Sequence, residues 1–107
     1  MAPRRPFRIV YDPEVSLHLA TVDRRWHPAI RRAVEEQLTH EPGTRTRNRK
    51  PLDEPSAPGW DWELRCGPGN RVRVFYWIDA ARREVQVLAV GVKLGSRLFV
   101  GGEEFPI

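Results

Sequence analysis

Basic side chains gather on the part of the chain that most clearly predicts a β-sheet. Residues 60–65 and 71–79 alternate with the two-residue period of strands. The polar face of these predicted strands, together with the end of the next one, carries four cations: Arg65, Arg71, Arg73 and Lys93. Cations that converge on a rigid sheet can dock a phosphate or stabilise the charge of a phosphodiester transition state. The pattern therefore predicts a site for a phosphate backbone.

A proline-rich basic loop is expected next to this face, at residues 44–59. It holds the densest positive charge in the chain, at Arg45, Arg47, Arg49 and Lys50. Arginine forks can bind phosphate oxygens in pairs, which favours nucleic-acid binding by this loop. The alternative interpretation, a solvated linker, has equal weight because a run of charge alone does not define a site.

Two carboxylates, Asp61 and Glu63, share the predicted polar face with the arginines. Either could take a proton, but a cross-strand ion pair between Glu63 and Arg73 is the favoured interpretation. The three histidines are dispersed, Cys66 is the single cysteine, and the glycines near it precede no helix. We therefore expect no metal site, no cofactor and no phosphate-binding glycine loop.

The strands are expected to form a hairpin at residues 71–93 with a four-residue loop at 80–83. This register places Asp79 opposite Glu84, Arg73 opposite Val90 and Val74 opposite Ala89. Its wholly apolar face should hold the helices, and it comprises Val72, Val74, Tyr76, Ile78, Val85, Val87 and Ala89.

A symmetric turn at residues 66–70 would join the strand at 60–65 to this hairpin. Arg65 would then pair with Arg71, Glu63 with Arg73, and Asp61 with Phe75. The same register adds three apolar residues to the helix-covered core: Trp60, Trp62 and Leu64. The opposite, open face would leave an apolar patch for a partner or for the chain's own tail at 101–107, made of Phe75, Leu88 and Val90.

The N-terminal part predicts one strand and two helices. Residues 7–11 read as a strand, and Asp12-Pro13-Glu14 is typical of a helix start. One helix stripe recurs at Val15, Leu19, Val22 and Trp26, and a second, opened by Pro28, recurs at Ile30, Ala33, Val34 and Leu38. The predicted fold class is α+β, with an N-terminal strand and a two-helix hairpin packed on one face of a small, mainly antiparallel sheet.

Length and composition are those of one domain spanning residues 1–107. The chain has 107 residues, a formal net charge of +4 and 40% hydrophobic residues, enough for a single core. Modest excess basicity favours nucleic acid or acidic protein surfaces as partners. The N-terminal apolar run, interrupted by Arg8, is too short for a signal sequence or a membrane span, so we expect a cytoplasmic protein that binds no membrane.

Four segments in this order resemble the RelE/ParE superfamily of type II toxin-antitoxin toxins. They are NRKPL at 48–52, WELR at 62–65, RVFYWID at 73–79 and VQVLAVGVK at 85–93. The resemblance implies a small toxin that is neutralised by a cognate antitoxin. RelE-like members enter the ribosome and cut mRNA with basic residues of the sheet, whereas ParE-like members inhibit DNA gyrase and cut nothing.

The resemblance implies a role for particular residues. Arg73 matches the arginine that opens the long central strand, and Lys93 matches the basic residue after the glycine of the last long strand. As a ribosome-associated mRNA endoribonuclease, the chain would use four catalytic cations, Arg73, Arg65, Lys93 and Lys50. Its further nucleic-acid contacts would be Arg45, Arg47, Arg49, Lys50 and Arg71, and its antitoxin contacts Phe75, Leu88 and Val90.

Two alternatives stay open at this point. RelE-like enzymes carry lysines where this chain has Asp61 and Glu63, and a C-terminal tyrosine where it has Phe99. A ParE-like inhibitor of gyrase, or a toxin-like protein that only binds its antitoxin, would need none of those groups.

Overall fold

The computed structural model describes residues 5–54 and 57–106, which form an α+β fold. A seven-stranded sheet has the order β2-β3-β4-β5-β6-β7, with β1 added beside β5. The first four strands are β1 (Arg8–Tyr11), β2 (Arg49–Pro51), β3 (Trp62–Cys66) and β4 (Val72–Asp79). The last three are β5 (Glu84–Leu94), β6 (Arg97–Val100) and β7 (Glu103–Phe105). Residues 1–4, 55–56 and 107, including parts of the predicted basic loop and tail, lie outside the described residues.

Strand β5 is the centre of the sheet. It pairs along its length with β4, in antiparallel orientation. Its other edge pairs with β1 over residues 84–87, in parallel, and with β6 over residues 91–94, in antiparallel orientation. The remaining strand pairs are antiparallel, so the prediction of a mainly antiparallel sheet is confirmed.

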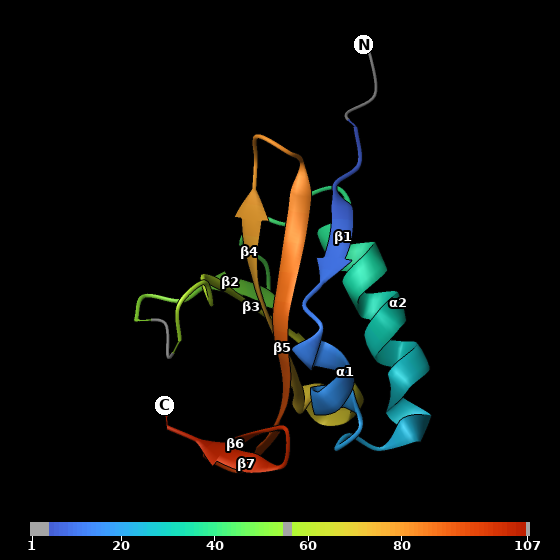
Figure 1. Ribbon diagram of the computed structural model, residues 1–107, viewed down its shortest axis with the longest axis vertical. Helices are drawn as coiled ribbons and strands as arrows, with labels where there is room; N and C mark the ends of the chain where they lie inside the picture. The colour runs from blue at the N-terminus through green and yellow to red at the C-terminus, as the bar shows by residue number, and fades with distance from the viewer. Residues whose placement is uncertain (1–4, 55–56, 107) are drawn as a thin grey trace.

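Both helices cover one face of this sheet (Figure 1). Helix α1 (Glu14–Leu19) begins after Asp12, whose Oδ1 accepts a hydrogen bond from the Glu14 amide at 2.9 Å. Helix α2 (His27–Leu38) follows the single 3₁₀ turn η1 (Arg24–Trp26), and Pro28 lies in its first turn. The second predicted helix is confirmed, whereas the first is six residues long and does not reach Trp26. It ends early because the chain turns at Thr21 and Val22, whose amides donate to the carbonyls of His18 and Leu19.

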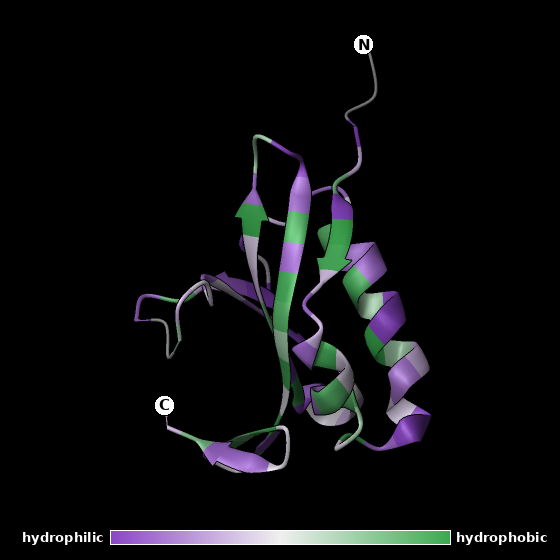
Figure 2. Ribbon diagram, in the orientation of Figure 1, coloured by the Kyte–Doolittle hydropathy of each residue, from purple (hydrophilic) through white to green (hydrophobic). Residues whose placement is uncertain are grey.

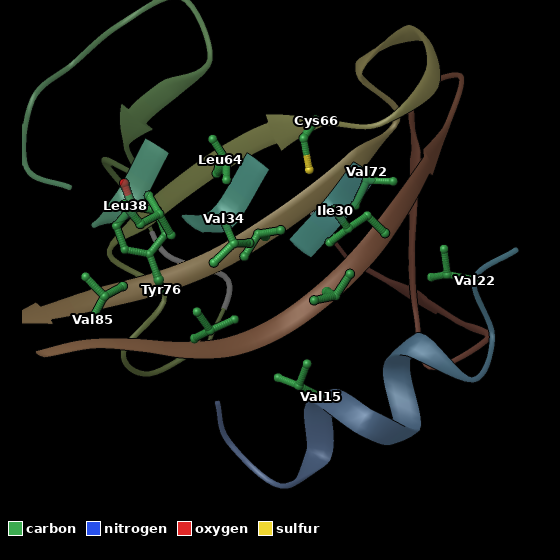
Figure 3. Close-up of a cluster of buried hydrophobic side chains, with 13 residues drawn as sticks. Val15, Val22, Ile30, Val34, Leu38, Leu64, Cys66, Val72, Tyr76 and Val85 are labelled. Atoms are coloured by element: carbon green, nitrogen blue, oxygen red, sulfur yellow. The ribbon is translucent and has the colours of Figure 1, made fainter. Parts of the chain in front are cut away.

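The core under the helices is almost wholly aliphatic (Figure 3). Helix residues Val15, Ile30, Val34 and Leu38 meet the strand residues that point toward them. The strand side comprises Leu64, Cys66, Val72, Val74, Tyr76, Val85, Val87 and Val90. Colouring by hydropathy shows the apolar stripe of α2 turned toward the sheet and its hydrophilic stripe turned away (Figure 2). The predicted helix face is therefore correct in most of its residues.

The predicted register of the central hairpin is correct only near its loop. Asp79 pairs with Glu84 as expected, but the register shifts between Phe75 and Tyr76. Tyr76 pairs with Val87 and Phe75 pairs with Ala89, so Leu88 is an extra residue. This β-bulge shifts every β4–β5 residue pair between the bulge and the start of β4 by one position. Val74 therefore pairs with Val90, and Arg73 with Gly91, in place of the predicted Ala89 and Val90.

The bulge also exchanges the faces on which two residues lie. Val90 is buried in the core under the helices, whereas Ala89 is buried in a second cluster on the opposite face. Trp60 belongs to this second cluster as well, so its predicted place beneath the helices is wrong. Its ring stacks on Phe75 on one side and on Phe105 of β7 on the other, with centroids 4.4 and 4.8 Å apart.

Candidate phosphate-binding site

Two arginines lie directly opposite each other on the face of the sheet away from the helices. Arg65 of β3 is the cross-strand partner of Arg73 of β4, and the predicted pairing of Arg65 with Arg71 is wrong by two residues. Glu63, two residues from Arg65, lies between the two guanidinium groups. Its Oε1 accepts from Arg73 Nη1 at 2.6 Å and from Arg65 Nε at 3.2 Å. The predicted ion pair of Glu63 and Arg73 therefore exists, but it is diagonal and involves a second arginine.

Exposure differs across these three side chains. The side chain of Glu63 is 8% exposed, that of Arg73 15% and that of Arg65 37%. Within residues 5–54 and 57–106, the Glu63 carboxylate accepts its hydrogen bonds through Oε1. The carboxylate is thus fixed through one oxygen, while Oε2 has no protein donor in the described part of the chain. Two cations share one anion, which leaves excess positive charge for an incoming anion.

The turn before β4 holds Arg73 in place. Turn η2 (Pro68–Asn70) contains Gly69 and Asn70 at φ values of 61° and 55°, in the left-handed region. Asn is among the few non-glycine residues that adopt this region readily. This conformation places the Asn70 carbonyl where it accepts from Arg73 Nε at 3.2 Å. Arg73 is therefore bound at two of its nitrogens before any ligand arrives.

The neighbouring strand brings a lysine to the same cluster. Lys50 of β2 is the cross-strand partner of Glu63. Asn48, just before β2, donates from Nδ2 to the Arg65 carbonyl at 3.0 Å, and its own carbonyl accepts from the Arg65 amide at 2.8 Å. These bonds fix the end of the basic loop against β3. We name Lys50, Glu63, Arg65 and Arg73 the sheet cluster.

The remaining predicted cations fall into three different positions. Arg45 and Arg47 are exposed in the segment before β2. Arg71 is exposed, and its carbonyl accepts from the Lys93 amide at 2.7 Å, which brings these two residues together at the end of the hairpin. Arg49 is different, because it is only 6% exposed and points to the helix side. Its guanidinium donates to the Gln37 carbonyl in the last turn of α2, where a cation is favourable.

Arg49 therefore stabilises the fold, and its predicted contact with nucleic acid is not compatible with its burial. The sequence signal for this role was its position in the alternation of β2. Arg49 pairs with Leu64, which faces the helices, whereas Lys50 pairs with Glu63, which faces away.

The predicted open apolar patch does not exist as such. Phe75 is buried beneath Trp60, and Leu88 packs at the edge of the same cluster. Val90 lies on the helix side. The C-terminal strand β7 covers this face through Phe105. Of the two expected occupants, a partner or the chain's own tail, the tail is therefore the one in place.

A groove on the helix side was not anticipated from the sequence. It lies between the β1–α1 segment and α2, with a volume of about 850 Å³, and residues of its floor include Val15, Ile30 and Val34. Tyr11 is at its rim, where burial, and next the charge of Glu35, raise the pKa of the phenol. Amphipathic spacing predicted the apolar stripe of each helix, but it could not predict how far apart the two helices lie or the groove between them.

One histidine near this groove has a structural role. The side chain of His18 accepts, through Nδ1, a hydrogen bond of 3.3 Å from the Val90 amide. Val90 lies in the stretch of β5 between β1 and β6, where that edge has no strand partner in the described pairings. His18 thus satisfies a backbone donor in the gap between β1 and β6.

Comparison with known proteins adds no family: no family model and no curated protein matches this sequence. Among the described residues, no helix is long and apolar enough to cross a membrane. The same residues contain no group of three or more His, Cys, Asp or Glu side chains that could hold a metal ion.

Proposed function

We propose that the sheet cluster binds a phosphodiester of RNA and promotes its cleavage. The observation that carries this proposal is the pair of cross-strand arginines held by a single carboxylate oxygen. A guanidinium pair of this kind offers donors in fixed directions, which suits the oxygens of a phosphate as negative charge develops on them. The exposure of Arg65 and the position of Lys50 beside Glu63 leave the cluster open to a strand crossing the sheet.

The reaction that fits these groups is attack by a ribose 2′-hydroxyl on the adjacent phosphorus. Glu63 Oε2 takes the proton of the hydroxyl, a 2′-oxygen–phosphorus bond forms, and the bond to the 5′-oxygen breaks. Arg65 and Arg73 stabilise the pentacoordinate transition state. Guanidinium groups keep their protons at neutral pH, whereas an ammonium can give one up, so Lys50 is the donor to the leaving 5′-oxygen. The products are a 2′,3′-cyclic phosphate and a free 5′-hydroxyl.

In this proposal the chain is the toxin of a type II toxin-antitoxin pair, related to the RelE/ParE superfamily, and its substrate is mRNA on the ribosome. Support comes from the order of the four motif segments and from an α+β fold whose sheet carries the basic residues. The basic segment at Arg45 and Arg47 is exposed beside β2, as a contact to a longer RNA would require. Arg71 and Lys93 would bind the backbone farther along the hairpin.

A cognate antitoxin would bind the helix side in this proposal. The face that carries Phe75 is covered by Trp60 and β7, whereas the groove between the β1–α1 segment and α2 is a concave site lined partly by apolar side chains. Hydrogen exchange of the complex should therefore show protection in α1 and α2. Protection confined to β7 would contradict this assignment.

The test of the catalytic proposal is cell-free translation with mapping of mRNA ends. The chain should produce codon-phased cuts, and Arg73→Ala should lower their rate by about 100-fold or more, the usual effect of removing one donor to a developing oxyanion. Arg24→Ala, an exposed arginine of η1 on the helix side, should cleave at the rate of the unchanged chain. Intact messages, together with lost gyrase supercoiling in a parallel assay, would show a gyrase inhibitor and overturn the proposal.

A further inference from the structure

A second basic pocket lies at the end of the hairpin loop, apart from the sheet cluster. It has a volume of about 360 Å³ and is lined by Arg5, Phe7, His40 and Arg83. Arg83 ends the β4–β5 loop, whereas Arg73 lies near the start of β4, so the length of that strand separates the two places. In Figure 1 this loop lies at one end of the molecule and the turn before β4 toward the other.

Three chain segments are joined by backbone hydrogen bonds around this pocket. The Phe7 amide donates to the Thr39 carbonyl at 2.6 Å, and the Arg8 amide donates to the Arg83 carbonyl at 2.9 Å. The segment before β1, the end of α2 and the hairpin loop are thereby held together. The backbone therefore fixes the relative positions of the segments that carry the lining residues.

Arg83 is held in an unusual way for an arginine of a loop. Its backbone has a φ of 49°, in the left-handed region that non-glycine residues adopt rarely. Its guanidinium carbon lies 4.2 Å from the centre of the Phe7 ring, and Nη2 donates to the Arg5 carbonyl. Among the described residues, Arg83 Nε is buried without a hydrogen-bond partner. An uncommon backbone conformation and an unpaired buried donor, each of which costs free energy, thus coincide in the residue that lines the pocket.

The charge of the lining is all of one sign. Arg5, His40 and Arg83 are its ionisable residues, and no carboxylate is among the four lining residues. The acidic groups nearest in sequence have other partners: Glu84 binds Arg8, and Asp79 lies near Arg82. Glu41 follows His40 but does not line the pocket. An anion entering here meets the guanidinium groups of Arg5 and Arg83 and the imidazole of His40.

We propose that this Arg83 pocket binds a phosphoryl group. The planar fork of a guanidinium fixed by stacking matches two phosphate oxygens, and His40 and Arg5 supply further donors. The volume exceeds that of a phosphate ion, so the pocket admits a phosphate monoester with part of its organic group. The phosphoryl group can come from free inorganic phosphate, from the end of an oligoribonucleotide or from an internal phosphate of a strand.

The experiment is titration of the full-length chain with inorganic phosphate, at constant ionic strength against chloride, followed by amide NMR shifts. Saturable shifts are expected at the amides of Phe7 and Arg8, next to the pocket. Arg83→Gln should weaken binding at least tenfold. Arg82→Gln is the matched control because Arg82 is the preceding residue, is exposed and does not line the pocket; it should bind as the unchanged chain does.

A second variant distinguishes a loss of binding from a folding defect in Arg83→Gln. Arg5→Gln keeps the Arg5 carbonyl that Arg83 uses and changes an exposed side chain, and it should weaken binding at least threefold. Shifts that do not saturate, or equal losses in the Arg82 and Arg83 variants, would overturn the proposal.

Trinucleotides with and without a 5′-phosphate identify the source of the phosphoryl group. Pocket shifts with the phosphorylated form alone assign a terminal phosphate, and equal shifts with both assign an internal phosphate. Either result supports the pocket. Shifts confined to β3 and β4, with none at Phe7 and Arg8 for any of the three ligands, would overturn it and leave the sheet cluster unaffected.

Discussion

The two faces of the sheet are built from the same strands but by different physical means. Under the helices, aliphatic side chains from alternate strand positions pack with Val34 and Leu38 of α2. The opposite face combines an aromatic stack around Trp60 with the ion pairs of Glu63, Arg65 and Arg73. Burial alone can hold the first face together, whereas the second also depends on directed contacts. The comparison indicates that stability resides chiefly on the helix side, whereas the face proposed to bind RNA depends on directed polar contacts.

The largest expected effect is on the helix side. Leu38 is 0% exposed at the end of α2, so Leu38→Ala should lower the free energy of unfolding by about 2–5 kcal/mol, through lost burial and the cavity left behind. Leu17 of α1 is 67% exposed, and Leu17→Ala should change the free energy of unfolding by less than about 0.5 kcal/mol. Urea unfolding measures both. Equal losses in the two variants would contradict this division of the helix surface.

A smaller effect is expected from the ion pairs of the opposite face. Glu63→Gln removes the charge that Arg65 and Arg73 share and should destabilise the fold by about 1–3 kcal/mol. This destabilisation is smaller than for a fully buried ion pair because Arg65 is partly exposed, and water screens its interaction with Glu63. Glu103→Gln, an exposed acid of β7, is the control and should be nearly neutral. If Glu63→Gln is as stable as the control, the cluster contributes no net stability and only orders the arginines.

The helix side could be predicted from the sequence because periodicity depends on burial. The spacing of Ile30, Val34 and Leu38, and the alternation of Val72, Val74 and Tyr76, each indicated the correct face. The end of α1 could not be predicted, since it depends on a turn at Thr21 and Val22 that leaves no strong signal in the sequence.

The opposite face could be predicted only in part. The ion pair of Glu63 with Arg73 was predicted from a cross-strand register that is wrong, and the same register hid the contact of Arg65 with Glu63. The loop between the paired residues Cys66 and Val72 lies at 67–71, one residue later than predicted, with Gly67, Gly69 and Asn70 all at positive φ. One bulged residue, Leu88, then changed the faces of Ala89 and Val90. A strand reverses its faces with a single inserted residue, so alternation beyond a bulge misleads.

The smallest expected effect concerns Cys66, which lies in the core under the helices but near Arg73. Burial raises the pKa of the Cys66 thiol to about 11 from its ordinary value of 9.0, against the opposing charge of Arg73. Between these values the unfolded chain releases the thiol proton and the native chain keeps it, so stability falls as pH rises from 9 to 11. At pH 10 the loss should be about 1 kcal/mol relative to pH 8.

Urea unfolding at pH 8, 9 and 10 checks this, with Cys66→Ala as the matched variant. That variant loses packing by the same amount at every pH, and it retains the titrations of Tyr11 and Tyr76, whose pKa values are also raised by burial. The difference in slope between the two chains therefore isolates the thiol. Parallel slopes would mean that Cys66 ionises as readily in the native state as in the unfolded one. The charge of Arg73 would then reach through the sheet strongly enough to offset burial, and the two faces would be electrostatically coupled.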